Sequence, residues 1–404
     1  MVALFIEWIE FAVRWLHVIT AIAWIGSSFY FIALDLGLHR DRNLATGADG
    51  EEWQVHGGGF YHIQKYLVAP ASMPSDLIWH KWQSYSTWLS GFALMAVVYY
   101  LGGDLYLVDP SKLEWPLWQA VAASMASLAV GWVLYDLLCK SKFGDDNTRL
   151  MVFLYIILVA MAWGYNQIFT GRAALLHLGA FTATIMTANV FFIIIPNQKI
   201  VVADLIAGRK PDPKYGKIAK QRSTHNNYLT LPVIFLMLSN HYPLAFGTKY
   251  NWIIASLVFL MGVTIRHYFN SMHARKGQPN WTWALTAIIF IVIIWLSTAS
   301  RWEYQEEASL SPAAHRYAQA EGFDLVTDIV MGNCSMCHAA EPAWDGVHIP
   351  PKGVMLETPE QIASHARQIY VQAGASHAMP PPAASYISDE DRAEIVRWYT
   401  SVSG

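Results

Sequence analysis

Two cysteines and a histidine stand close together toward the carboxyl end of the chain, as Cys334-Ser-Met-Cys337-His338. Two thiols three positions apart can add to the two vinyl groups of a haem, and the adjacent His338 can then ligate the iron. A redox dithiol has no use for this histidine, and a zinc site would need a second cysteine pair, which does not follow. The motif therefore predicts one covalently attached c-type haem, with Cys334 and Cys337 as its attachment sites.

The second axial ligand of such a haem has to approach the opposite face of the iron. Met379 lies about 40 residues beyond the motif and is followed by three prolines, which place a thioether on a stiff segment. We predict Met379 as this ligand, with His377 as its main competitor. Met331 and Met336 are too close to the motif to cross the ring, and Met355 lacks the proline segment.

Helical patterns flank the haem motif on both sides. Residues 321–331 pattern as a helix that leads into the motif, and Ser388 with Asp391 forms a capping box at the start of a final helix. Two helices around a loop-rich middle resemble a class I cytochrome c. We expect residues 309–404 to form that domain, after a linker at 301–308.

The chain before the linker is much less polar than a soluble domain. Of the 404 residues 54% are hydrophobic and 14% are charged, against about 25% charged in ordinary soluble domains. Stretches of about 20 apolar residues, enough to cross a bilayer as a helix, recur only up to Ser300. We predict an all-α protein in which residues 1–300 form an eight-helix transmembrane bundle surrounded by membrane lipid. The predicted spans are 4–36, 85–101, 117–138, 150–169, 173–195, 228–246, 252–269 and 281–298.

The basic residues of the loops predict the orientation of these helices. Sixteen lysines and arginines fall in one alternate set of loops and three, Lys112, Arg172 and Lys249, in the other. Because basic loops stay on the cytoplasmic side, we expect both termini and the haem-bearing tail in the periplasm, with the bundle in a bacterial inner membrane. The formal net charge of -3 gives no reason to expect a nucleic-acid partner.

Ionisable residues inside the predicted spans are costly in lipid and are therefore candidates for function. On the first span, four of them fall on one stripe at the helical period: Glu10, Arg14, His17 and Asp35. The histidines form two layers, with His17, His177 and His241 toward the outer side and His80, His225 and His267 toward the inner side.

Paired imidazoles from different helices can hold b-type haem. One or two b haems are therefore a further cofactor hypothesis, with His17, His177 and His267 as candidate ligands. For any one of these histidines, the structural alternative is a buried side chain that is hydrogen-bonded to a neighbour.

The segment between the first two predicted spans contains His56-Gly57-Gly58-Gly59-Phe60-Tyr61-His62. Three consecutive glycines lower local order unless a close backbone approach requires them. We therefore interpret this loop as a lid over a cavity on the inner side. It is not a phosphate loop, because the Walker lysine and serine are missing.

Three segments, together with the haem motif, resemble the membrane-bound bacterial urate oxidases, also called urate hydroxylases. They are WLHVITAIAWIG at 15–26, HGGGFY at 56–61 and WLSG at 88–91. The resemblance spans essentially the full chain and implies oxidation of urate to 5-hydroxyisourate. In that reaction water supplies the oxygen, and the electrons pass to the c haem instead of forming hydrogen peroxide. An external acceptor, such as a terminal oxidase or a soluble cytochrome, would then empty the haem.

Urate is planar and anionic, so its site needs cationic and amide donors beside a flat apolar wall. Arg266, His267 and Asn270 are the predicted contacts at the inner end of the seventh span, although Arg266 could instead extend to the membrane surface. His17 is predicted to be a haem ligand or the acceptor of a substrate proton, and Asp35 to pass protons on. The alternative function is an electron-transfer subunit that carries electrons from quinol or a partner dehydrogenase to the periplasm.

Overall fold

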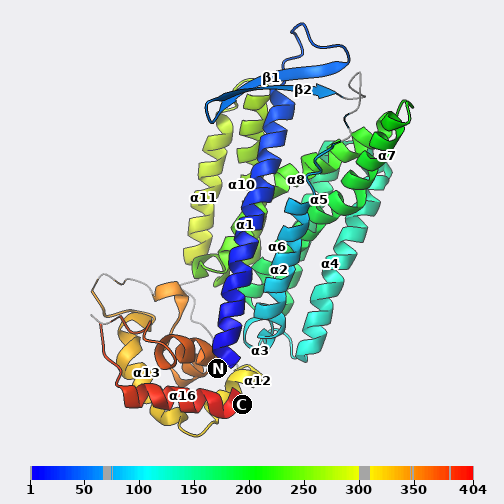
Figure 1. Ribbon diagram of the computed structural model, residues 1–404. Coiled ribbons are helices and arrows are strands. Elements are labelled where there is room, and N and C mark those ends of the chain that lie inside the picture. Colours follow the sequence, from blue (N-terminus) through cyan, green and yellow to red (C-terminus); the bar gives the residue numbers. More distant parts are fainter. Residues whose placement is uncertain are drawn as a thin grey trace.

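The computed structural model describes residues 2–66, 74, 76–299, 310–345, 347, 350–381 and 384–403, and most of them are helical (Figure 1). Long helices form a bundle up to residue 299, and shorter helices form a tail from residue 310 onward. The predicted linker at 301–308 lies outside the described residues.

The bundle is built from the following helices: α1 (Val2–Gly37), α2 (Trp82–Met95), α3 (Gly103–Tyr106), α4 (Leu117–Lys140), α5 (Asn147–Ile168), α6 (Gly171–Ala188), α7 (Ile195–Ile206), α8 (Pro213–Ser239), α9 (Pro243–Phe246), α10 (Asn251–His273) and α11 (Trp281–Ala299). Among the described residues, six stretches are long and apolar enough to cross a membrane; they lie in α1, α4, α5, α6 continued by α7, α10 and α11. The two other predicted spans fall on α2, which has 14 residues before a π-helical segment (Ala96–Tyr100), and on α8, whose first turns are polar. The number of eight spans therefore stays a prediction.

Helix α6 lies at the centre of the bundle. It packs against α2, α4, α5 and α8, and its residues Leu178 and Phe181 are 0% and 2% exposed. Helix α11 lies at the periphery, where Ile291 and Trp295 are each 64% exposed. Apolar side chains on the outer face and a tightly packed central helix are the pattern expected of a bundle surrounded by lipid.

A β-hairpin corrects the all-α prediction. Strands β1 (Ala48–His56) and β2 (Gly59–Tyr66) pair antiparallel. Gly57 and Gly58 form the turn with φ of 59° and 81°, values that favour glycine. A Cβ atom at either position would meet no protein atom within 4 Å, so the turn geometry accounts for these glycines and no close packing within the protein requires them.

The hairpin crosses the end of the bundle that is opposite the tail (Figure 1). Lys65 of β2 forms an ion pair with Asp35 of α1, and the Tyr30 hydroxyl donates to Gln54 Oε1 at 2.7 Å. The structure thus uses Asp35 to hold the hairpin on α1. Glu52, Trp53 and Gln54 of β1 line a second pocket at this end, together with residues of α1 and α10. No described hairpin residue lines the cavity around His17 described below, so the lid over an inner cavity stays a prediction.

The tail has a hydrophobic core of its own. Its helices are α12 (Pro312–Ala318), α13 (Phe323–His338), α14 (Pro359–Ser364), α15 (Ala366–Ile369) and α16 (Asp389–Ser403). The predicted helix into the haem motif is confirmed by α13, which ends at His338. The predicted cap of the last helix is also confirmed, because the Asp391 N–H donates to Ser388 Oγ at 3.1 Å. Trp398 of α16 is 1% exposed and donates through Nε1 to the Tyr317 carbonyl.

The tail lies against the end of the bundle where α1 begins (Figure 1). Arg367 Nη2 is 2.6 Å from a carboxylate oxygen of Glu7 and 3.7 Å from one of Glu10. Beside it, Gln368 Nε2 donates to the Tyr106 hydroxyl at 2.6 Å. Polar contacts from one short helix of the tail therefore reach both α1 and α3.

Candidate active site

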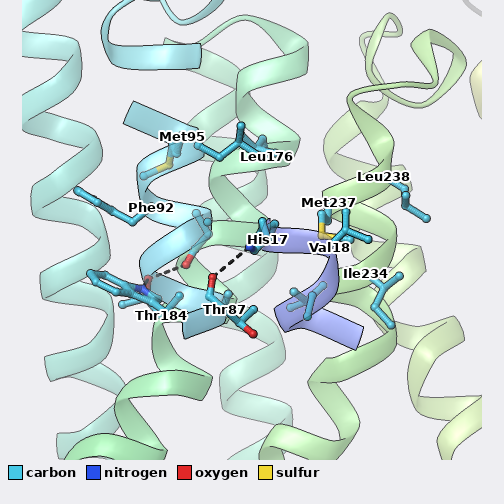
Figure 2. Close-up of a pocket in the computed structure, with 18 of the residues that line it drawn as sticks. His17, Val18, Thr87, Phe92, Met95, Leu176, Thr184, Ile234, Met237 and Leu238 are labelled. Carbon is cyan, nitrogen blue, oxygen red and sulfur yellow. Dashed lines mark hydrogen bonds between the residues drawn. The ribbon is translucent and has the colours of Figure 1, made fainter. Parts of the chain in front are cut away.

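A cavity of about 190 Å³ lies inside the bundle between α1, α2, α6 and α8 (Figure 2). Most of its lining is apolar, and Trp24, Trp88 and Phe92 are aromatic side chains in it. The Trp88 and Phe92 rings stack with centroids 5.3 Å apart. Both arginines of the lining, Arg14 in the first half of α1 and Arg172 at the start of α6, lie on the side of the cavity toward the tail, as do Asn240 and His241 directly after α8.

His17 projects from α1 into the wall of this cavity and contacts α2 (Figure 2). Its Nδ1 is 3.0 Å from the Thr87 carbonyl oxygen and 3.2 Å from Ser90 Oγ. The Ser90 hydroxyl donates to the Ser86 carbonyl at 2.6 Å. Because a carbonyl oxygen can only accept, Nδ1 carries the proton and Nε2 keeps its lone pair. His17 thus offers a proton acceptor to the cavity.

Gly91 of α2 makes the position of His17 possible. A Cβ atom at residue 91 would lie 2.7 Å from His17 Cε1 and 3.2 Å from Nδ1, closer than van der Waals contact allows. The imidazole therefore occupies the space that any other residue at 91 would fill. The resemblance included Gly91 in WLSG, but its contact with His17 follows only from the packing of α1 on α2.

Four polar atoms around the cavity are buried without a hydrogen-bond partner among the described residues: Tyr99 Oη, Arg172 Nε, Thr187 Oγ1 and Asn240 Oδ1. Buried polar groups are normally paired, and each one left unpaired costs about 1–3 kcal/mol. A polar ligand in the cavity would supply the missing partners. Sequence reasoning misses all four residues as site residues, and Arg172 enters it only as one of the basic loop residues.

The tail carries a donor set that fits a c-type haem. His338 Nδ1 is 2.8 Å from the Val354 carbonyl, which fixes the ring and leaves Nε2 for iron, as a haem-ligating histidine requires. Cys334 and Cys337 are free thiols, and burial raises the pKa of Cys334 to about 11.

The segment around Met379 is held from two sides. The Met379 backbone N–H donates to the Gln372 carbonyl at 2.9 Å, and Arg392 Nη1 donates to the Met379 carbonyl at 3.3 Å. The Met379 side chain itself is 38% exposed. Its role as the second axial ligand stays a prediction.

The comparison with known families decides what the bundle is. Residues 3–297 match the family model described as urate oxidase N-terminal. The chain belongs to this urate oxidase family. No curated protein and no solved structure matches the chain. Every cavity residue named above lies within the urate oxidase region, whereas the haem motif and Met379 lie outside it.

The other predicted urate contacts, Arg266, His267 and Asn270, lie in the urate oxidase region but away from the cavity. Arg266 is 5% exposed, so it does not extend to the surface. Its Nη2 donates to Asn270 Oδ1 at 3.0 Å, and its guanidinium lies 4.3 Å from the centroid of the Phe29 ring. His267 lies beside Trp281, with ring centroids 6.1 Å apart. Arg266 and Asn270 are thus brought together as predicted, but neither they nor His267 line the cavity that contains His17.

His177 is also separate from the cavity lining. It is 0% exposed, its Nδ1 is 2.8 Å from the Ala173 carbonyl of its own helix, and its ring packs against Tyr99, Tyr165 and Phe169. Of the predicted b-haem ligands, only His17 lines the cavity, where His241 is the other histidine. A b haem held by His17, His177 and His267 stays a prediction.

Proposed function

We propose that this protein oxidises urate in the cavity around His17 and passes the electrons to a c-type haem in its tail. The family assignment supports urate as the substrate. The observation that carries the site is that flat apolar walls and unpartnered buried polar atoms surround one cavity in the urate oxidase region. A planar purine can stack on such walls, and its ring nitrogens and oxygens can supply the missing hydrogen bonds.

The overall reaction adds water to urate. The water oxygen forms a bond to C5 of the purine, two electrons leave the purine, and two protons are released, which gives 5-hydroxyisourate. His17 Nε2 accepts one of these protons, because the bond from Nδ1–H to the Thr87 carbonyl holds the tautomer in which Nε2 is basic. The same bond persists in the imidazolium form and stabilises it.

The electrons leave through the tail. A haem attached at Cys334 and Cys337, ligated by His338 and Met379, supplies a one-electron acceptor when bound. Because urate gives up two electrons and such a haem would take one at a time, an external acceptor such as a terminal oxidase or a soluble cytochrome would have to reoxidise it, or one or two b haems would take the other electron. The contacts of Arg367 and Gln368 hold the tail against the polar end of the bundle, next to the cavity.

The bundle belongs, in this proposal, in a bacterial inner membrane, with both termini and the tail in the periplasm. The six apolar helices and the exposed Ile291 and Trp295 of α11 support burial in lipid. The basic loop residues support the orientation.

In the deciding experiment, the purified full-length protein in detergent is mixed with urate under anaerobic conditions, and the absorbance of haem c is followed. Urate alone should reduce the haem, and 5-hydroxyisourate should form in step. An electron-transfer subunit would show no reduction until quinol or a partner dehydrogenase is added, and that result would overturn the proposal. A variant with Cys334→Ser and Cys337→Ser, which has no covalent haem, controls for direct reaction of urate with other components.

A further inference from the structure

Arg172 is a cation without a matching anion among the described side chains. It stands in the first turn of α6, where the positive end of the helix dipole disfavours a positive side chain. Its Nε is buried and has no hydrogen-bond partner, and no carboxylate among the described side chains lies within ion-pair distance of it. A cation in such a position is stabilised by a bound anion.

The other cations near the cavity have partners. Arg14 forms an ion pair with Glu10 and lies 3.3 Å, through Nη1, from His241 Nε2. Arg266 donates to amide oxygens of Asn227 and Asn270 and does not line this cavity. Among the described lining residues, Arg172 therefore has positive charge left for a ligand.

A second group with unused hydrogen-bonding capacity lies on the same side of the cavity. Tyr99 is 2% exposed, lines the cavity, and its buried hydroxyl has no hydrogen-bond partner among the described residues. Arg172 acts on this hydroxyl through its charge and as a nearby side-chain donor, although the pair does not reach hydrogen-bond geometry, so the two groups face a common region. Tyr99 belongs to the π-helical segment Ala96–Tyr100, a type of helix turn that is frequent at functional sites.

The Tyr106 ring lies against both groups. The Arg172 guanidinium carbon is 5.2 Å from the centroid of this ring, and the Tyr99 ring centroid is 6.5 Å from it. Stacking on an aromatic ring restricts the guanidinium without using its N–H donors. Arg172 is thus held in place while it keeps donors for a ligand.

We propose that Arg172 and Tyr99 bind the anionic edge of the substrate and so determine that an anionic purine is selected over a neutral one. This inference rests on the proposed function, because it names the contacts of urate in the same cavity. The guanidinium of Arg172 pairs with a deprotonated nitrogen and the neighbouring carbonyl oxygen of the purine, and the Tyr99 hydroxyl donates to the same edge. His17, from α1, remains available for the proton that the reaction releases.

The test compares urate with hypoxanthine, a purine that is neutral at pH 7, by equilibrium dialysis of the full-length protein in detergent. Arg172→Gln should weaken urate binding about 10- to 100-fold, the range for losing a hydrogen bond to a charged group, and leave hypoxanthine binding unchanged. Arg172→Lys keeps the charge and should recover part of the affinity. Tyr99→Phe, which removes only the hydroxyl, should weaken urate binding several-fold. Arg149→Gln, an exposed arginine at the opposite end of the bundle, is the matched control and should bind urate as the wild type does.

Three outcomes overturn the inference: urate affinity unchanged in Arg172→Gln, equal loss of both purines in that variant, or loss of urate binding in Arg266→Gln alone. Haem content and elution volume identify any variant that fails to fold, and Tyr99→Phe then carries the test. The proposed function fails in a different way. If the wild type binds urate in an Arg172-dependent manner but urate never reduces the haem, the binding site stands and the oxidation does not.

Discussion

Arg367 of the tail lies 2.6 Å from Glu7 of α1 and 3.7 Å from Glu10, and Glu10 is also the ion-pair partner of Arg14 at the cavity. One carboxylate thus stands between a cation of the tail and a cation of the cavity. The arginine side chain is only 12% exposed, so water screens this pair less than an ordinary surface pair.

Replacing Arg367 should slow the transfer of electrons from the bundle to the tail. In Arg367→Gln, the tail remains tethered but loses its ionic contact, so we expect urate-dependent haem reduction to fall about two- to tenfold. Because the pair is partly shielded from water, raising the ionic strength should slow the wild type only slightly more than the variant. Stopped-flow absorbance of the haem measures both rates. Arg397→Gln, which removes an exposed pair with Glu394, should change neither, and an equal effect of both substitutions would refute the docking role.

Met379→His should leave the haem attached but lower its reduction potential. A thioether stabilises ferrous iron better than an imidazole does, so the exchange favours the ferric state. Redox titration of the full-length protein gives the potential, and the weak near-infrared band of sulfur–iron ligation should disappear. His377→Ala should leave both unchanged. If the wild type lacks the band and the potential shifts in His377→Ala instead, His377 is the ligand, whereas a band that survives in Met379→His assigns the sulfur ligand to another methionine.

Local patterns predict the elements that depend on local chemistry. The cap at Ser388 and the helix that ends at His338 follow from short-range hydrogen bonds and helical periodicity, which can be read from neighbouring residues. The hairpin is missed when Gly57 and Gly58 are interpreted as a close approach to a ligand, whereas the flanking strands and the positive φ values indicate a two-residue turn.

The cavity can be predicted only in part. His17 stands out because an ionisable residue in an apolar helix is unusual. Arg172 and Tyr99 carry no such signal in the sequence. Arg172 is one of the basic residues expected in a loop, and Tyr99 is one of 20 tyrosines. That they lack partners among the described residues is a property of the packing between the segment Ala96–Tyr100, α3 and α6, which brings together residues that are far apart in the sequence.

The orientation prediction is that a reporter fused at Lys214 and one fused at the carboxyl terminus lie in opposite compartments. Lys214 belongs to the stretch around the start of α8 that contributes seven of the sixteen basic loop residues, more than any other loop, and such loops stay cytoplasmic. Paired fusions to alkaline phosphatase, active in the periplasm, and to a fluorescent protein, active in the cytoplasm, measure the two positions. Equal signals at both positions would refute the orientation.

His17→Ala should abolish urate-dependent reduction of haem c, while Cys334 and Cys337 still carry haem and the protein still inserts. The variant loses the Nε2 proton acceptor, and the hydrogen bonds to Thr87 and Ser90 are lost with it. Reduction is followed with urate and, separately, with dithionite, which shows that the haem remains reducible. Near-normal rates with urate would assign His17 a structural role.

Gly91→Ala tests the same histidine without removing it. The added methyl group would lie 2.7 Å from His17 Cε1, so the imidazole has to move and its bond from Nδ1 to the Thr87 carbonyl weakens. We expect a clear fall in the rate of urate-dependent reduction and a loss of about 1–3 kcal/mol of stability from overpacking.

Gly164→Ala is the matched control for this substitution, because a Cβ atom there meets nothing within 4 Å and alanine favours the helix. It should keep the wild-type rate of haem reduction and gain stability. A shift of the imidazole alone should already separate Nε2 from its substrate proton. If both Gly91→Ala and Gly164→Ala reduce the haem at the wild-type rate, the reaction does not depend on the packing of His17 against Gly91.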